Sequence, residues 1–197
     1  MQTATQKRYY TPEEYLELEE KAEFRSEYRN GEIIPMTGGT TNHNKIALNV
    51  AFALKFALRG QDYEIYIADV RLWLPRYQQY TYPDVMVIQG KPVYAGTNTT
   101  TVTNPSLIVE VLSKSTKNYD QGDKFHSYRS IPEFQEYILI DQYQYRVMQY
   151  VKTAADQWLF TELEGQAATL SLNTVDLQIS LPEIYEKVNF TDSEQEE

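Results

Sequence analysis

The sequence contains no cysteine, which excludes a disulfide framework, a thiolate metal site and a cysteine nucleophile. It also has no apolar run near the roughly 18 residues that a membrane span requires, and its first ten residues lack the apolar core of a signal peptide. From these absences we expect a soluble, cytoplasmic protein that has no membrane partner.

Basic residues are scarce, and they are unevenly placed. The net charge is -10, yet residues 24–130 carry nine acidic and twelve basic residues, a local net charge of +3. The excess of acid lies in residues 1–23 and 131–197. A domain that grips DNA without sequence preference is normally more basic. The middle of the chain therefore permits a phosphate-bearing substrate without requiring one.

A chain of 197 residues with 42% hydrophobic content can bury one sizeable core, so we expect one domain over residues 1–190. Residues 191–197 are acidic and have no apolar side chain, which predicts a disordered tail. Helices are expected at 12–23, 41–59, 120–130 and 182–188, and strands at 26–29, 32–36, 64–67, 70–74, 82–88, 107–112, 136–141, 145–151, 158–163, 169–172 and 175–179. The polar loop 75–80 favours an antiparallel pairing of strands 70–74 and 82–88. This order of elements predicts a mixed α/β sheet domain.

Local signals mark several boundaries of these elements. Thr11 followed by proline, with Glu14 three residues later, predicts a capped helix start. Asn30-Gly31 between two short strand-like runs predicts a β-hairpin. Thr41 or Asn42 is expected to cap the second helix.

Two acidic residues are embedded in apolar, strand-like runs. Asp84 lies in the run 82–88, and Glu110 lies in the run 107–112. Burying a carboxylate is costly unless it has a partner, a proton or a metal. If the two strands place these acids at one end of the sheet, the pair can hold a hard divalent cation.

A lysine is expected to complete such a site. In nucleases of the PD-(D/E)XK type the lysine stands two residues after the second acid, but Leu112 occupies that position here. Lys124, in the predicted helix that follows, is the candidate replacement.

Several motifs follow one another along the chain in a recognisable order: Glu27 with Gly31-Glu32-Ile33, His43 at a helix start, Pro83-Asp84-Val85, Ile108 to Ser113 before Ser115-Thr116, then Asp120, Lys124, Tyr128, and Glu136-Tyr137 with Asp141. In this order they resemble the Uma-two endonuclease family of the restriction-endonuclease-like superfamily. The resemblance covers roughly residues 10–185. In that family the active-site lysine is regarded as having moved from the strand to the following helix, where Lys124 stands here.

The resemblance implies a restriction-endonuclease-like core and a Mg²⁺- or Mn²⁺-dependent endonuclease acting on DNA. It implies that Asp84, Glu110 and the backbone carbonyl of Val111 bind the metal, and that Glu27 supplies a further contact. Lys124 would orient the attacking water or offset charge on the phosphate. Lys114 stands where the family often has proline, and it is a competing candidate for the lysine.

Each candidate also has a purely structural interpretation. Asp84 and Glu110 can bond to backbone amides or form an ion pair, Lys124 can pair with Asp120 on a solvated helix face, and Glu27 can pair with an arginine across a hairpin. His43 can hydrogen-bond near the site or cap its helix, and Tyr128 can pack in the core.

Two functions are therefore carried forward from the sequence. The first is a metal-dependent DNA endonuclease, expected to work as a homodimer because cutting both strands of a duplex commonly uses two related sites. The alternative is an interaction module that retains the nuclease fold without efficient turnover. The acidic overall charge and the absence of lysine at position 112 favour this alternative.

Overall fold

The computed structural model describes residues 8–114 and 116–191, so the expected tail lies outside the described residues except for Thr191. The helical segments are α1 (Pro12–Glu19), α2 (Thr41–Ala57), η1 (Pro75–Tyr77), α3 (Lys117–Tyr119), η2 (Asp120–Lys124), α4 (Phe125–Tyr128) and α5 (Leu181–Ile184). The strands are β1 (Ser26–Arg29), β2 (Glu32–Pro35), β3 (Tyr63–Ile67), β4 (Arg71–Leu74), β5 (Gln79–Thr81), β6 (Val85–Gln89), β7 (Thr101–Val102), β8 (Leu107–Leu112), β9 (Glu136–Asp141), β10 (Arg146–Lys152), β11 (Trp158–Glu164), β12 (Thr169–Ser171) and β13 (Gln178–Ser180). None of the described helices is long and apolar enough to cross a membrane. The mixed α/β class expected from the sequence is confirmed.

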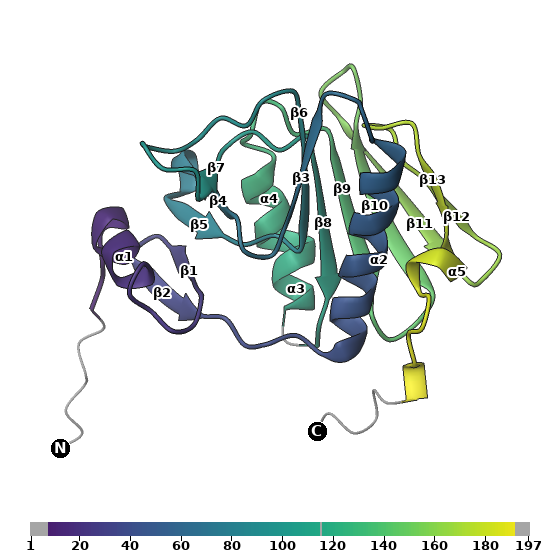
Figure 1. The fold of residues 1–197 in the computed structure, drawn as a ribbon, viewed down its shortest axis with the longest axis horizontal. Helices are drawn as coiled ribbons and strands as arrows, with labels where there is room; N and C mark the ends of the chain where they lie inside the picture. Colours follow the sequence, from purple (N-terminus) through teal and green to yellow (C-terminus); the bar gives the residue numbers. More distant parts are fainter. Residues whose placement is uncertain (1–7, 115, 192–197) are drawn as a thin grey trace.

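The strands form two main sheets and one small hairpin. The larger sheet has the order β11-β10-β9-β8-β6-β3, the smaller has the order β2-β1-β5-β4-β7, and β12 pairs with β13. Within the larger sheet β8 and β9 are parallel, and the other neighbouring pairs are antiparallel. In Figure 1, α2 lies over one side of the larger sheet, and α3 and α4 lie on the other side, next to the smaller sheet.

The expected pairing of strands 70–74 and 82–88 is wrong. β4 pairs with β5, while β6 belongs to the larger sheet and pairs with β3 and β8. The predicted strand 82–88 begins only at Val85, because Pro83 has no N–H to donate to a ladder and because the Asp84 carboxylate bonds to the backbone of β8. The chain therefore passes from one sheet to the other at Pro83-Asp84, which places Asp84 where the two sheets meet.

The N-terminal signals give the expected elements with small shifts of their boundaries. Thr11 and Glu14 form a complete capping box at the start of α1. The helix ends at Glu19 rather than near residue 23, because the Glu19 carboxylate accepts the N–H of Ser26, where β1 begins. Asn30 and Gly31 both have positive φ, as a two-residue hairpin turn requires.

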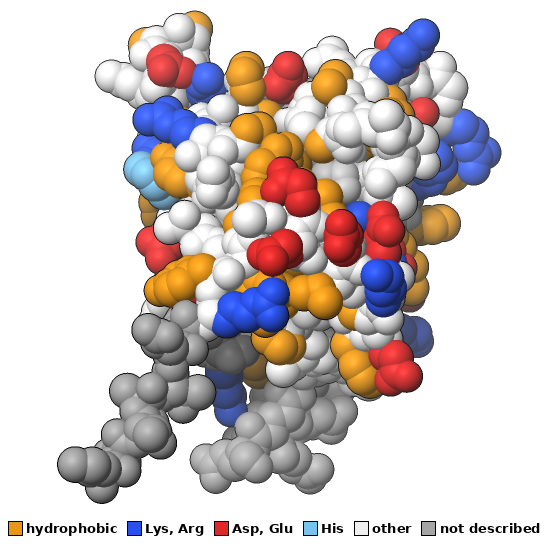
Figure 2. Space-filling model, turned by 90° about the vertical axis from the view of Figure 1, so that its left-hand side faces the viewer, with side chains coloured by type: hydrophobic (Ala, Val, Ile, Leu, Met, Phe, Trp, Pro, Cys, Tyr) orange, Lys and Arg blue, Asp and Glu red, His pale blue; other side chains and the backbone are white. Residues whose placement is uncertain are grey.

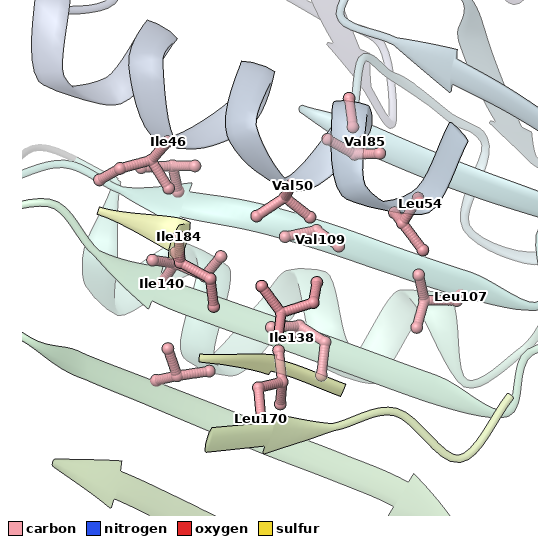
Figure 3. Close-up of a cluster of buried hydrophobic side chains, with 14 of the residues drawn as sticks. Ile46, Val50, Leu54, Val85, Leu107, Val109, Ile138, Ile140, Leu170 and Ile184 are labelled. Atoms are coloured by element: carbon pink, nitrogen blue, oxygen red, sulfur yellow. The ribbon is translucent and has the colours of Figure 1, made fainter. Parts of the chain in front are cut away.

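α2 packs its apolar side against the larger sheet. Its N-cap is Thr40 rather than Thr41 or Asn42, because the Thr40 hydroxyl accepts the N–H of His43. Ile46, Val50 and Leu54 recur every fourth residue, and all three are buried against β6, β8 and β9 (Figure 3). This contact fixes α2, and with it His43, over the end of β8.

Replacing Leu54 with alanine is expected to lower the free energy of unfolding by about 2–5 kcal/mol, because Leu54 is fully buried and the substitution leaves a cavity. Leu48 on the same helix is 59% exposed, so Leu48→Ala should change stability by no more than about 0.5 kcal/mol. Urea unfolding of the two variants measures both values. Equal losses would contradict the packing of α2 described here.

The segment after β8 is helical but not uniformly so. It begins at Lys117, three residues before the expected start, and Asp120–Lys124 forms a π-helical turn. Single π turns inside helices occur often at functional sites, since they change which side chains face inward. Here the turn buries both Asp120 and Lys124.

The C-terminal elements are tied to the sheet by a buried acid. Glu136 in β9 is fully buried, and its carboxylate accepts the backbone N–H groups of Asn173 and Thr174 and the side-chain amide of Gln149. Glu136 is thus satisfied by structural hydrogen bonds.

Candidate active site

Asp84 and Glu110 meet on neighbouring strands. Val85 pairs with Val109, and one further step along this antiparallel register places Asp84 beside Glu110. The Asp84 carboxylate accepts the N–H of Val111 at 2.7 Å, and its Oδ2 lies 3.2 Å from Nε2 of His43. The two embedded acids therefore share one end of the β6–β8 pair, as the sequence predicted.

Lys124 lies among three carboxylates. Its Nζ is 3.0 Å from Oε1 of Glu110, 3.2 Å from Oδ1 of Asp120 and 3.7 Å from Oε1 of Glu27. One turn later, Tyr128 donates its hydroxyl to the same Glu110 oxygen at 2.7 Å. The helical segment after β8 thus supplies two hydrogen-bond donors to one carboxylate oxygen.

Glu27 pairs with an arginine, although within one strand and not across the hairpin as its structural interpretation expected, and it also faces the lysine of the cluster. It pairs with Arg29 on its own strand, and its carboxylate also accepts the hydroxyl of Thr81 and faces Lys124. The Arg29 guanidinium stacks over the ring of Tyr119 at 3.5 Å from the ring centroid. The smaller sheet therefore contributes an acid that faces the two acids of the larger sheet.

Lys124, and not Lys114, is the lysine that the fold brings to Glu110. Lys114 is exposed, and its Nζ lies 5.9 Å from the ring centroid of Tyr143. Lys124 is only 6% exposed, and nothing in the helical periodicity predicted this burial. His43 is not the cap of α2; its imidazole contacts Asp84.

Asp120 is the member of the cluster whose position sequence reasoning missed. The sequence indicated only that it pairs with Lys124 on a solvated face, whereas it is 2% exposed. Its Oδ1 has no hydrogen-bond partner among the described residues and lies within ion-pair distance of Lys124. The signal in the sequence was its spacing of four residues before Lys124.

The charges of this cluster shift several pKa values. The pKa of Glu110 is raised overall: burial is the largest cause, the charge of Lys124 opposes it, and the nearby charges of Asp84 and Asp120 add to it. Burial alone lowers the pKa of Lys124, but the charges of Glu110, Glu27 and Asp120 outweigh it and raise this pKa well above its ordinary value.

The pKa values of Glu27 and His43, at the outside of the cluster, shift so that the charged form of each side chain is favoured. Burial raises the pKa of Glu27, but Lys124 and Arg29 outweigh burial and lower this pKa overall. Burial lowers the pKa of His43, and its hydrogen bond to Asp84 more than compensates, so this pKa is raised. Perturbed groups gathered in this way are typical of functional sites.

The donor atoms of the cluster suit a hard divalent cation. Mg²⁺ prefers oxygen ligands and is commonly held by one or two carboxylates with several waters, and Asp84 and Glu110 supply such a pair. The Asp84 side chain is 17% exposed, so solvent reaches it. Within residues 8–114 and 116–191, however, no three His, Asp or Glu side chains form a ready-made metal cluster. A divalent cation at this site would therefore be held by two carboxylates and water molecules.

The surface around α1 is unsuited to a phosphate backbone. Figure 2 shows acidic side chains gathered in the middle of the face at the left of Figure 1, with Lys and Arg side chains around them. α1 lies on this side and exposes Glu13, Glu17 and Glu20. Phosphates are repelled by such a surface, so this side of the molecule is unsuited to binding a polyanion.

The sequence is similar to a family of known proteins and to two individual relatives. Residues 12–182 match the Uma2 family, described as "Putative restriction endonuclease". Two proteins of Synechocystis sp. (strain ATCC 27184 / PCC 6803 / Kazusa) are similar over most of their length: the uncharacterized protein sll1609 is 46% identical over 163 residues (83% of this chain and 92% of that protein), and the uncharacterized protein slr1290 is 34% identical over 180 residues (91% and 93%).

A solved structure has a similar fold. It is a crystal structure from Anabaena variabilis ATCC 29413, described as "a putative nuclease belonging to DUF820"; it superposes with a TM-score of 0.74 at 19% sequence identity and covers 89% of this chain and 97% of its own. At that identity the likeness shows the fold alone, while the family match and the two relatives cover most of the sequence. This chain therefore belongs to the Uma2 family and has a nuclease-like fold.

Proposed function

We propose that this chain is a Mg²⁺-dependent endonuclease that hydrolyses phosphodiester bonds of DNA. The observation that carries the proposal is the meeting of Asp84 and Glu110 at one end of the β6–β8 pair, with the Lys124 ammonium 3.0 Å from Glu110. Family membership supports a nuclease, and Mn²⁺ is expected to substitute for Mg²⁺.

The residues have distinct roles in this proposal. Asp84 and Glu110, with the carbonyl of Val111, hold the metal ion, which when bound polarises the scissile phosphate and lowers the pKa of its water. Lys124 places a fixed positive charge where negative charge develops on the phosphate oxygens. Glu27 and Asp120 hold that ammonium in place.

Two further side chains position the carboxylates. His43 contacts Asp84, and Tyr128 donates to Glu110. Partners of this kind fix the orientation of metal-binding groups, and their loss typically costs activity without removing it. His43 and Tyr128 are therefore assigned positioning roles.

A cleavage assay tests the proposal. Purified full-length protein is incubated with supercoiled plasmid, linear duplex, single-stranded DNA and RNA in Mg²⁺, in Mn²⁺ and in EDTA. Nicking or cutting of DNA that requires the divalent metal supports the proposal, and the RNA sample tests the choice of substrate. Inactivity on every DNA substrate with both metals contradicts it.

One observation favours the alternative, an interaction module with a nuclease fold. The site is closed by its own side chains: one oxygen of Glu110 accepts bonds from Lys124 and Tyr128, and one oxygen of Asp84 accepts the N–H of Val111 and contacts His43. Calorimetry with Mg²⁺ separates the two functions. Metal binding that Asp84→Asn abolishes supports the nuclease, and no metal binding in the wild type supports the module.

Tyr128→Phe is expected to lower the cleavage rate by about 10- to 100-fold, because Glu110 loses the hydroxyl that orients it. Initial rates on supercoiled plasmid measure this loss. Tyr77→Phe is the matched control, since its hydroxyl contacts His126 instead of the carboxylates, and it should keep the wild-type rate. An unchanged rate in Tyr128→Phe would show that the hydroxyl has no positioning role.

A further inference from the structure

β11 forms an edge of the larger sheet and is exposed on both faces. It runs for seven residues, Trp158–Glu164, and β10 is its strand neighbour. Leu159 is 60% exposed and Phe160 is 49% exposed. A long edge strand with exposed apolar side chains is a template for pairing with another chain.

The outward-facing backbone groups of β11 follow from its register. The N–H of Thr153 bonds to the carbonyl of Gln157, and the N–H of Gly165 bonds to the carbonyl of Tyr145. Because hydrogen-bonded pairs alternate along an antiparallel ladder, the odd-numbered residues of β11 bond to β10. The even-numbered residues, from Trp158 to Glu164, direct their N–H and C=O groups away from the sheet. Within the described part of the chain, no strand lies beyond them.

The opposite edge strand of the sheet, β3, is shorter and exposes less apolar surface than β11. β3 has five residues, Tyr63–Ile67, and of these only Ile67 is a large apolar side chain that is mostly exposed. β11 is thus the edge with the longer row of outward backbone groups and with more exposed apolar surface.

The sequence of β11 is complementary to itself in one antiparallel register. With Thr161 facing Thr161 of a second copy, Phe160 lies opposite Glu162 of that copy and Trp158 opposite its Glu164, so every outward backbone group is paired. On the other face Leu159 lies opposite Leu163 of the second copy, which forms an apolar contact across the junction.

The two neighbouring registers that keep the same hydrogen-bond alternation are less favourable. A shift in one direction places Glu162 opposite its own copy. A shift in the other direction places Glu164 opposite Asp156 of the second copy, which lies in the turn before β11 with φ 59°, so the outward backbone groups of Glu164 have no strand residue to pair with. Like charges directly opposite one another destabilise a strand pair, which disfavours the first of these registers, and the second pairs fewer outward backbone groups, so the register centred on Thr161 is favoured.

We infer that β11 pairs antiparallel with β11 of a second copy around Thr161, which joins the two larger sheets into one continuous sheet. The contact is isologous, as expected for a two-fold dimer. It does not depend on the proposed activity, and either can fail without the other.

Position 161 allows a test that is specific for this register, because the residue there faces its own copy. Thr161→Lys and Thr161→Glu each place two like charges opposite one another, so each should weaken dimerisation by about tenfold or more. An equal mixture of the two variants should dimerise again, since lysine then faces glutamate. Sedimentation velocity on full-length protein over a concentration series measures the association. Thr169→Lys, an exposed strand threonine of β12, is the matched control and should dimerise like the wild type.

Four outcomes of this experiment are distinguishable. A wild-type dimer that both single variants disrupt and that their mixture restores supports it. A wild type that stays monomeric at all concentrations overturns it, as does a Thr161→Lys protein that still dimerises. Single variants that are monomeric alone and in the mixture overturn the register centred on Thr161. Circular dichroism of each variant confirms that the fold is retained.

Discussion

Replacing Glu110 with glutamine is expected to reduce DNA cleavage by about a thousandfold or more. Glutamine keeps the shape of the side chain but removes a negative charge that we propose as a metal ligand. A bound metal ion contributes several kcal/mol of charge stabilisation in the transition state, and each 1.4 kcal/mol corresponds to tenfold in rate. The measurement is the single-turnover cleavage rate on supercoiled plasmid at saturating Mg²⁺.

A second buried acid in the adjacent strand provides the control. Glu136 is as buried as Glu110, but its carboxylate bonds to Asn173, Thr174 and Gln149 at the other end of the sheet. Glu136→Gln is therefore expected to cost stability and to leave the cleavage rate of the folded protein unchanged. Cleavage retained in Glu110→Gln would reject the assigned metal site, and equal losses of activity in the two variants would indicate unfolding instead.

Replacing Lys124 with methionine is expected to lower the free energy of unfolding by about 3–5 kcal/mol at neutral pH, the usual cost of leaving a buried charge without its partner. Lys124 compensates Glu110, Asp120 and Glu27 within 3.0 to 3.7 Å, and methionine supplies similar bulk without the charge. Urea unfolding measures the loss. Cleavage should also fall, because the proposed charge near the phosphate is removed.

Two further variants separate charge from packing. In the double variant Lys124→Met/Glu110→Gln one of the uncompensated carboxylates is absent, so its loss of stability should be smaller than that of Lys124→Met alone. Lys152 pairs with the exposed Asp156 at 2.8 Å, and Lys152→Met should cost no more than about 1 kcal/mol. If Lys124→Met proved as mild as Lys152→Met, the ammonium would not be compensating the buried acids.

Local patterns in the sequence were sufficient for most of the helices and strands. The capping box at Thr11, the Asn30-Gly31 turn and the four-residue recurrence of Ile46, Val50 and Leu54 are decided by neighbours in the chain, and all three are found in the structure. The observed ends of two elements differ from the predicted ones because residues distant in the sequence contact them. α1 ends early because of a contact with β1, and the strand predicted at 82–88 begins only at Val85, after the chain changes sheets.

By itself, the sequence determined the class of the fold and the two embedded acids, because a carboxylate in a β-branched run is anomalous whatever surrounds it. It left the lysine open between Lys124 and Lys114, and it indicated a solvated face for Asp120. Only the tertiary structure decided these points: the π turn after β8 carries Lys124 and Asp120 into the space between the two sheets, where Glu27 arrives from the smaller sheet. The physical reason is that the burial of a charge depends on groups distant in sequence. Helical spacing shows which side chains share a face, but not what that face contacts.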